Sequence, residues 1–206
     1  GVQTCALPIY LTVTVRGLQV HGAPAERSMA GQRVALNLHG VQTAELSRGM
    51  VLARPGELEA SHILDVRLDM LPGFAMKHLQ RVRFHHGAAE LLARVALLTG
   101  EDVPPGESAY CQLRLEARYP AVPGDRAVLR RYSPLVTIAG AEVLDVRPHK
   151  RRRGRAAIEA IRQLDGVGDI ERLRQWVAAA GDRGLDELRL ARRCGRNGAT
   201  FADSLE

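Results

Sequence analysis

The sequence of 206 residues has little lysine, few aromatic side chains and no long apolar run. Because no stretch of about 18 apolar residues occurs, we expect no membrane-spanning helix and no membrane partner. No basic segment followed by an apolar core is found at the start, so we expect no signal peptide and a cytoplasmic location. The three cysteines, Cys5, Cys111 and Cys194, are odd in number and far apart, which favours reduced thiols over a disulfide framework.

Patterns that carry catalysis or bind metals are also missing from the sequence. No GxxxxGK[ST] motif occurs, and neither of the two lysines, Lys77 and Lys150, follows a glycine, which excludes a phosphate-binding P-loop. No cysteine–histidine cluster has metal-ligand spacing, and no Ser/His/Asp grouping stands out. We therefore predict no catalytic site, no metal site and no bound cofactor within these residues.

Arginine is abundant, since it supplies all but two of the 29 basic residues. Residues 1–146 contain 15 Lys and Arg against 14 Asp and Glu, whereas residues 147–206 contain 14 against 9. This basic excess favours a polyanionic partner for the C-terminal segment, most simply nucleic acid. Guanidinium groups bind phosphate in a bidentate way, although a GC-rich genome would also enrich arginine.

The first nine residues, GVQTCALPI, differ in character from the rest of the chain. DNA resembling a common short-read sequencing adapter encodes these nine residues in one reading frame. The alternative is a native strand with a proline near its end. We interpret residues 1–9 as an adapter artefact, leave them out of the fold prediction and expect the native N-terminus to lie further upstream.

Alternation of apolar and polar residues predicts β-structure up to about residue 146. Leu11–Val15 and Arg33–Leu38 alternate in this way on either side of a turn-rich loop, and a boundary is predicted at Arg54-Pro55-Gly56. Residues 10–56 therefore form a first unit. Alternating runs separated by Pro-Gly turns predict a small barrel or sandwich over residues 57–146.

After residue 146 the apolar period changes to 3.6 residues. This spacing predicts helices over Ala156–Leu164, Asp169–Ala180 and Leu185–Cys194. Three short helices with a basic surface in residues 147–206 fit the opening of a winged-helix or other helix-turn-helix unit. Trp176 is expected in the core between helices rather than on the surface as a base-stacking platform.

Five blocks of sequence carry a resemblance to a known family. In chain order they are VRGLQVHG (Val15–Gly22), AGQRVALNL (Ala30–Leu38), RVRFHHGAAELLARVALL (Arg81–Leu98), PGESAYCQLRL (Pro105–Leu115) and GDRAVLRRYSPLVTIAGAEVLD (Gly124–Asp145). Over about Leu11 to His149 the sequence resembles the selenocysteine-specific translation elongation factors, the SelB family. Elongation factor Tu shares the barrel but not the HHG or RYSP sequence motifs.

The resemblance implies a mainly β chain with C-terminal α-structure. Residues 10–56 then correspond to part of the domain II barrel of a translation factor, and residues 57–146 to a nearly complete domain III-like barrel. Residues 147–206 correspond to a basic hinge and the start of a winged-helix region. The resemblance also implies a strand over Ala88–Leu98, where intrinsic propensity favours a helix.

The function that the resemblance implies is GTP-dependent delivery of selenocysteyl-tRNA to the ribosome for selenocysteine incorporation. This part would bind the aminoacyl-tRNA and begin the region that binds the selenocysteine-insertion hairpin of the mRNA. The GTPase domain, with its GTP and magnesium, is not among these residues, so we expect a fragment that is not itself an enzyme. We expect it to be a monomer.

The resemblance assigns a role to Arg33. In the family, the arginine of the AGQR element is thought to help the aminoacyl pocket recognise the selenocysteyl group, and Arg33 matches it. A selenol is acidic enough to be an anion at neutral pH, and a fixed guanidinium favours that anion over a neutral serine hydroxyl. The alternative is that Arg33 pairs with a carboxylate of the barrel.

Four further residues are candidate tRNA contacts. His85 and His86 are adjacent on a predicted strand and therefore point to opposite faces, which does not suit joint metal ligation or a catalytic pair. We expect one packed and one exposed histidine, with contact of the exposed one to the tRNA backbone as the functional alternative. Arg130 and Arg131 likewise lie on both faces, and one of them is expected to face solvent near the tRNA.

The segment from Arg147 to Arg155 contains six cationic residues in nine positions. A run of this kind is usually a solvated hinge. It is also suited to RNA phosphates, because each neutralised phosphate releases counterions and steepens the salt dependence of binding. The candidate phosphate contacts are Lys150, Arg151, Arg152, Arg153 and Arg155.

Two other functions stay open at this point. The chain could be an accessory barrel of another translational GTPase, or a DNA-binding regulator whose β unit senses a ligand and whose winged helix reads DNA. A GTPase domain encoded in frame upstream would exclude the regulator. Further winged helices downstream and a selenocysteine tRNA gene in the same genome would favour the selenocysteine-specific factor.

Overall fold

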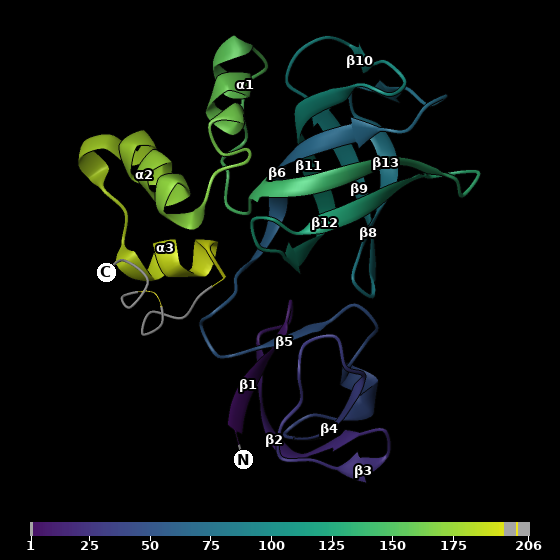
Figure 1. Ribbon diagram of the computed structural model, residues 1–206, viewed down its shortest axis with the longest axis vertical. Helices are drawn as coiled ribbons and strands as arrows, with labels where there is room; N and C mark the ends of the chain where they lie inside the picture. Colours follow the sequence, from purple (N-terminus) through teal and green to yellow (C-terminus); the bar gives the residue numbers. More distant parts are fainter. Residues whose placement is uncertain (1, 196–200, 202–206) are drawn as a thin grey trace.

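The computed structural model describes residues 2–195 and residue 201, in which two β units are followed by three helices. Figure 1 shows the N-terminal sheet below a barrel and the helices beside that barrel. The mainly β fold class with C-terminal α-structure is therefore confirmed. No helix among the described residues is long and apolar enough to cross a membrane.

The N-terminal unit is a five-stranded antiparallel sheet in the order β3-β2-β1-β5, with β4 also paired to β2. Its strands are β1 (Val2–Leu7), β2 (Leu11–Val20), β3 (Ala23–Pro24), β4 (Val34–His39) and β5 (Val51–Ala53), with a short 3-10 helix, η1 (Thr43–Glu45). The alternating β-branched residues at the start of β2 account for its extended conformation. His21 and Gly22, both with positive φ, form the two-residue turn to β3.

The exclusion of residues 1–9 from the fold is wrong for Val2–Leu7, which forms strand β1. This strand pairs with β2 on one side and with β5 on the other, and Cys5, Ala6 and Leu7 are buried. An extended segment with β-branched and apolar residues can satisfy the backbone donors and acceptors of two neighbouring strands at once. The adapter origin of these residues stays a prediction.

The second unit is a closed six-stranded barrel in the order β11-β6-β13-β12-β8-β9, with every neighbouring pair antiparallel. Its strands are β6 (Ala60–Met70), β8 (Gln80–His86), β9 (Ala89–Leu97), β11 (Ser108–Pro120), β12 (Arg126–Arg131) and β13 (Thr137–Asp145). A separate two-stranded ladder joins β7 (Met76–Lys77) to β10 (Asp102–Val103). Alternate residues of β6, namely Leu64, Val66, Leu68 and Met70, fill the barrel interior.

The strand predicted over Ala88–Leu98 is confirmed as β9. Gly87, with positive φ, lies in the turn from β8, and β9 pairs with β8 and β11 along almost its whole length. Ala93 and Val95 are fully buried in the barrel core. Pairing on both edges and burial of one face outweigh the helical propensity of the segment.

The N-terminal sheet approaches the barrel at the turn between β8 and β9. Arg48 Nε donates a hydrogen bond to the carbonyl of Ala88 at 3.1 Å. Gly49, with φ of 95°, lies so close that an added Cβ would be 2.8 Å from the Cα of Ala89. Only glycine is compatible with both this backbone conformation and this approach.

The three predicted helices are confirmed as α1 (Arg155–Arg162), α2 (Asp169–Ala180) and α3 (Glu187–Arg193), with the 3-10 turn η2 (Gly181–Arg183) between the last two. They share a second apolar core with two barrel residues, Leu98 and Leu144. Trp176 is 4% exposed within this core, as predicted. Burial of the apolar faces of these helices against the barrel stabilises an arrangement that helices this short would not keep alone.

We predict that Phe84→Ala strongly destabilises the barrel. Phe84 is fully buried, and its ring packs edge-on against Tyr119 with 5.9 Å between centroids. Loss of the ring leaves a cavity, which should lower the free energy of unfolding by about 3–5 kcal/mol in urea denaturation. Val128→Ala is the control, because Val128 is exposed on neighbouring β12 and should change stability by less than about 0.5 kcal/mol. Similar losses for the two variants would contradict this account of the core.

Candidate nucleic-acid interface

A buried polar network joins the barrel to the segment that follows it. Asp65, on β6, is fully buried and accepts hydrogen bonds from Gln112 Nε2 at 2.7 Å and from Arg151 Nε at 2.8 Å. Residues 146–155, here called the linker, join the barrel to helix α1. The Gln112 amide also binds the linker backbone, since it donates to the carbonyl of His149 at 3.0 Å and accepts from the amide of Arg151 at 3.0 Å. Each polar group of this network therefore has a partner, and residues 149–151 are held on the barrel.

A second buried carboxylate holds helix α3. Asp145, at the end of β13, is directly opposite Asp65 in the strand register and is also fully buried. Both of its carboxylate oxygens accept hydrogen bonds from Arg193, with the bond from Nε at 2.7 Å, and the amide of Arg147 adds a third. The Arg193 guanidinium lies over the ring of Trp176, 4.2 Å from its centroid. This bidentate pair with cation–π packing fixes α3 and α2 against the barrel.

The two carboxylates have an electrostatic cost that the arginines offset. Burial under the segment that follows the barrel raises the pKa of Asp65 to about 6, because desolvation disfavours the charged form, and nearby Asp145 adds to the rise. The Arg151 guanidinium and the Gln112 hydrogen bond act in the opposite direction and lower the pKa. Desolvation is the largest of these effects, so Asp65 is easier to protonate in the folded chain than in the unfolded one.

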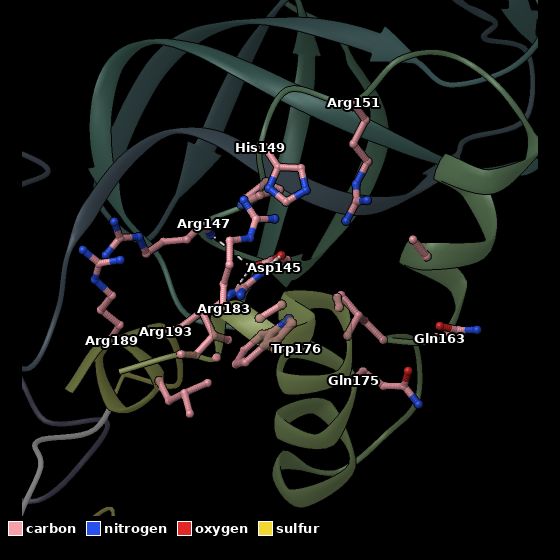
Figure 2. A pocket seen from close by; sticks show the side chains of 18 residues that line it. Asp145, Arg147, His149, Arg151, Gln163, Gln175, Trp176, Arg183, Arg189 and Arg193 are labelled. Carbon is pink, nitrogen blue, oxygen red and sulfur yellow. Dashed lines mark hydrogen bonds and ion pairs between the residues drawn. The ribbon is translucent and has the colours of Figure 1, made fainter. Parts of the chain in front are cut away.

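A pocket of about 450 Å³ lies where the barrel end, the linker and helices α2 and α3 meet (Figure 2). Figure 2 shows Asp145 and Trp176 in the middle of this pocket, with arginine side chains from several segments around them. Asp145 is the single acidic residue of the lining. The arginines of the lining are Arg147, Arg151, Arg183, Arg189 and Arg193. A concave surface of this composition is suited to an anionic partner.

The predicted phosphate contacts fall into two groups. Lys150, Arg152 and Arg155 are exposed, and none of them makes an ion pair within the described part of the chain. Arg153 Nη2 donates to Glu101 at 2.8 Å and to the carbonyl of Gly100. Lys150, Arg152 and Arg155, which are exposed and make no such ion pair, are therefore the ones available to a partner.

Arg151 does not fit the prediction of an RNA-phosphate contact. Its guanidinium is bound to the buried carboxylate of Asp65, and only 16% of its side chain is exposed. Arg147 is likewise paired with Glu59. The interpretation of the whole run as a solvated hinge is therefore wrong as well, because ion pairs with barrel acids attach the run to the barrel.

The two histidines are both half-buried, so the expectation of one packed and one exposed residue is wrong. His86 Nδ1 lies 2.9 Å from the Tyr119 hydroxyl, and its Nε2 lies 3.4 Å from an oxygen of Asp125. His85 Nε2 is buried without a hydrogen-bond partner among the described residues. Near the β8–β9 turn each ring is partly accessible. Contact of these rings with tRNA stays a prediction.

Arg130 and Arg131 are also both half-buried, and the expectation that one of them faces solvent near the tRNA stays a prediction. Arg130 Nη2 donates to the carbonyl of Leu135 at 2.7 Å, within the loop after β12. The Arg131 guanidinium lies over the ring of Phe74, 5.7 Å from its centroid. The register between β12 and β13 shifts between Leu129 and Arg130.

Arg33 is exposed immediately before strand β4. Because Val20 is opposite Val34, Arg33 lies at the end of the sheet beside the β2–β3 turn. Ion pairs within the described residues do not include Arg33, so the alternative that it pairs with a barrel carboxylate is not supported. Its guanidinium is free to meet a ligand.

The pocket was not predicted from the sequence. Asp65 and Asp145 occur as polar positions in alternating strands, where a carboxylate ordinarily faces solvent. Arg183 and Arg189 are separated from Asp145 by about forty residues, and no local spacing joins them. Asp65 lies on the outward face of β6, opposite to the face of Leu64 and Val66, so its burial under the segment after the barrel had no local signal. Among the described residues, no group of three or more His, Cys, Asp and Glu could hold a metal ion.

Comparison with known sequences gives a consistent result. A family model described as the β-barrel domain of the selenocysteine-specific elongation factor matches residues 62–150. The chain is 42% identical over 180 residues to a selenocysteine-specific elongation factor of Desulfomicrobium baculatum, covering 85% of the chain and 28% of that protein. It is 29% identical over 138 residues to that of Escherichia coli (strain K12), covering 66% of the chain and 21% of that protein. The chain thus spans less than a third of the length of these curated relatives.

Solved structures show the same fold. A bacterial selenocysteine-specific elongation factor, EF-Sec, superposes with a TM-score of 0.74 at 24% identity and covers 96% of this chain and 31% of that one. The elongation factor SelB of Methanococcus maripaludis in its apo form gives a TM-score of 0.60 at 20% identity, covering 72% and 37%. At these identities the likeness concerns the fold alone.

We predict that Asp65 makes stability depend on pH. The folded pKa of about 6 is above the ordinary value of 3.8, so the folded chain binds the proton more tightly than the unfolded one. Its stabilising contribution is complete below about pH 4 and is lost as pH rises through 6. Relative to Asp65→Asn, the wild-type free energy of unfolding should fall by roughly 3 kcal/mol between pH 4 and 7 in urea titrations.

The control for this titration is Asp69→Asn. Asp69 lies on the same strand, but 47% of its side chain is exposed, next to Arg67. Because Asp65 is intact in this variant, the fall in the free energy of unfolding between pH 4 and 7 should persist in Asp69→Asn. Parallel profiles for wild type and Asp65→Asn would mean that Asp65 stays charged in the folded barrel.

Proposed function

Because the chain belongs to the family of selenocysteine-specific elongation factors, we propose that it is part of a GTP-dependent factor that delivers selenocysteyl-tRNA to the ribosome. The observation that carries this proposal is the closed barrel formed by β6 to β13, which coincides with the matched family domain over residues 62–150. The curated relatives are more than three times as long as the matched region. We infer that GTP and magnesium are bound by other parts of such a factor, and that these residues catalyse no reaction.

The two β units are proposed to bind the aminoacyl-tRNA. Arg33 supports this role, because its exposed guanidinium carries no ion pair within the described residues and lies at the end of the N-terminal sheet. A selenolate placed there would gain a charge-assisted hydrogen bond that a serine hydroxyl cannot match. His85, His86, Arg130 and Arg131 remain candidate contacts to the tRNA backbone, through the parts of their side chains that are accessible.

The C-terminal segment is proposed to begin the region that binds the selenocysteine-insertion hairpin of the mRNA. The three exposed linker cations, Lys150, Arg152 and Arg155, support contact with RNA phosphates. A factor of this kind would work as a monomer in the cytoplasm, in contact with the ribosome. These assignments rest on the family and on the charge of the segment.

We predict that Arg33→Ala reduces discrimination between selenocysteyl-tRNA and seryl-tRNA. In the full-length factor, affinity for selenocysteyl-tRNA should fall about tenfold or more, because one hydrogen bond to a charged group is lost. Affinity for seryl-tRNA should hardly change. Protection of each aminoacyl ester from hydrolysis, with GTP present, measures both affinities.

Arg33→Lys is the matched variant, since it keeps the charge and removes the planar fork. It should restore part of the preference for selenocysteyl-tRNA. An equal loss of affinity for the two tRNAs in Arg33→Ala would show that Arg33 acts on the tRNA body or on the sheet, and the pocket assignment would be wrong.

We predict that replacement of Lys150, Arg152 and Arg155 by alanine together weakens RNA binding. The slope of log affinity against log salt should become shallower by about 2 to 3, because each phosphate contact contributes roughly 0.7–0.9. Filter binding at several salt concentrations measures this slope. The control removes three other exposed charges, in Arg126, Arg162 and Arg174, and should leave the slope nearly unchanged. Equal slopes in the two variants would mean that the linker residues affect RNA binding only through the net charge of the chain.

A further inference from the structure

We propose that the arginine-lined pocket between the barrel and helices α2 and α3 holds one unpaired nucleotide of a bound RNA. In this arrangement the phosphate lies on Arg183 and Arg189, and the base enters the apolar interior. The inference rests on the proposed RNA-binding function and adds a specific site and a preference for unpaired nucleotides.

The five arginines of the pocket lining fall into two groups, those that pair with a carboxylate and those that do not. Three lining arginines have carboxylate partners, since Arg151 pairs with Asp65, Arg193 with Asp145, and Arg147 with Glu59. The other two, Arg183 and Arg189, are exposed and make no ion pair within the described residues. An excess positive charge is therefore left on two exposed guanidinium groups of the lining, each of which can bind a phosphate.

The interior of the pocket has the size and chemistry of a nucleobase site. A volume of about 450 Å³ lies within the usual range for small-molecule pockets, about 300–1,000 Å³. Its apolar walls include Leu164, Leu185 and Leu190, and the amide of Gln163 can donate and accept hydrogen bonds. A side chain with both donor and acceptor can bind the edge of a base that is not paired.

The preference for an unpaired nucleotide follows from the concave shape. In a duplex the base is stacked and paired, so only backbone phosphates could reach Arg183 and Arg189. A splayed-out nucleotide can place its phosphate on these arginines and its base inside at the same time. The exposed linker cations continue the positive surface away from the pocket and could hold the flanking phosphates.

The pocket is also a seam between two parts of the molecule. One wall is formed by the barrel end and the linker, with Asp145 and His149, and the other by the helices, with Trp176 and Arg189 (Figure 2). A nucleotide that touches both walls would stabilise the docked helices, by an amount that grows with the logarithm of its concentration relative to its Kd. Trp176 is the single tryptophan of the sequence, so its fluorescence reports directly on this seam.

The test compares a short single-stranded oligoribonucleotide with a blunt duplex of the same sequence, each titrated into the intact chain. Binding of the single strand should change Trp176 fluorescence, and the duplex should bind with a much smaller change. Arg183→Ala with Arg189→Ala should weaken single-strand binding about tenfold or more and flatten its salt slope by about 1.4. Arg126→Ala with Arg174→Ala removes the same charge elsewhere and should have little effect.

A neutral substitution separates base entry from charge. Ala179 lines the pocket, whereas the adjacent Ala178 is exposed on the same helix and does not. Ala179→Phe should lower single-strand affinity and suppress the fluorescence change without altering the salt slope, and Ala178→Phe should behave like wild type. Equal behaviour of the two phenylalanine variants would overturn the pocket proposal and leave only a surface phosphate contact.

Failure of this inference can be told apart from failure of the proposed function. If the linker variant at Lys150, Arg152 and Arg155 loses RNA affinity while the pocket variants do not, the pocket proposal is wrong and RNA binding stands. If wild type binds no RNA at all, both are wrong. Selenocysteine tRNA and the insertion hairpin, each titrated separately into the wild-type chain, identify the RNA that supplies the nucleotide, because only that RNA should change Trp176 fluorescence as the single strand does.

Discussion

Two carboxylates buried opposite each other at one end of the barrel fix the position of everything that follows it. Asp65 and Asp145 face one another across β6 and β13, where neither could stay ionised alone without a large desolvation cost. Arg151 from the linker and Arg193 from α3 supply the compensating charges. The barrel end and the C-terminal helices are therefore electrostatically incomplete without each other.

This constraint explains how one arginine-rich segment can serve two purposes. Some of its arginines are used inside the molecule, as anchors on barrel acids, and cannot also bind a partner. Others, such as Arg152 and Arg155, remain exposed and give the segment its outward charge. Arginine suits both uses, because its guanidinium keeps its charge when partly buried and can form bidentate or stacked contacts.

The candidate RNA sites lie on different parts of the molecule. Arg33 lies at the end of the N-terminal sheet, and the pocket lies beside the barrel, between it and helices α2 and α3 (Figure 1). Residues 48 and 49 hold the N-terminal sheet against the barrel, while the buried aspartates hold the helices. An RNA bound at both ends would thus meet sites whose relative positions are set mainly by barrel contacts. In such an arrangement, ion pairs inside the protein determine where the outward-facing charges are presented.

The sequence by itself determined the class of most elements, because a period of two or of 3.6 is a local property of the chain. It also determined the family, through ordered blocks that include the AGQR segment with Arg33, and with the family the strand at Ala89–Leu97 that local propensity did not favour. Only the tertiary structure decided that Val2–Leu7 joins the sheet and that Arg151 is internal. These outcomes depend on partners such as Asp65, 86 residues from Arg151 in the chain. Closure of the barrel brings such residues together, and no local pattern encodes that proximity.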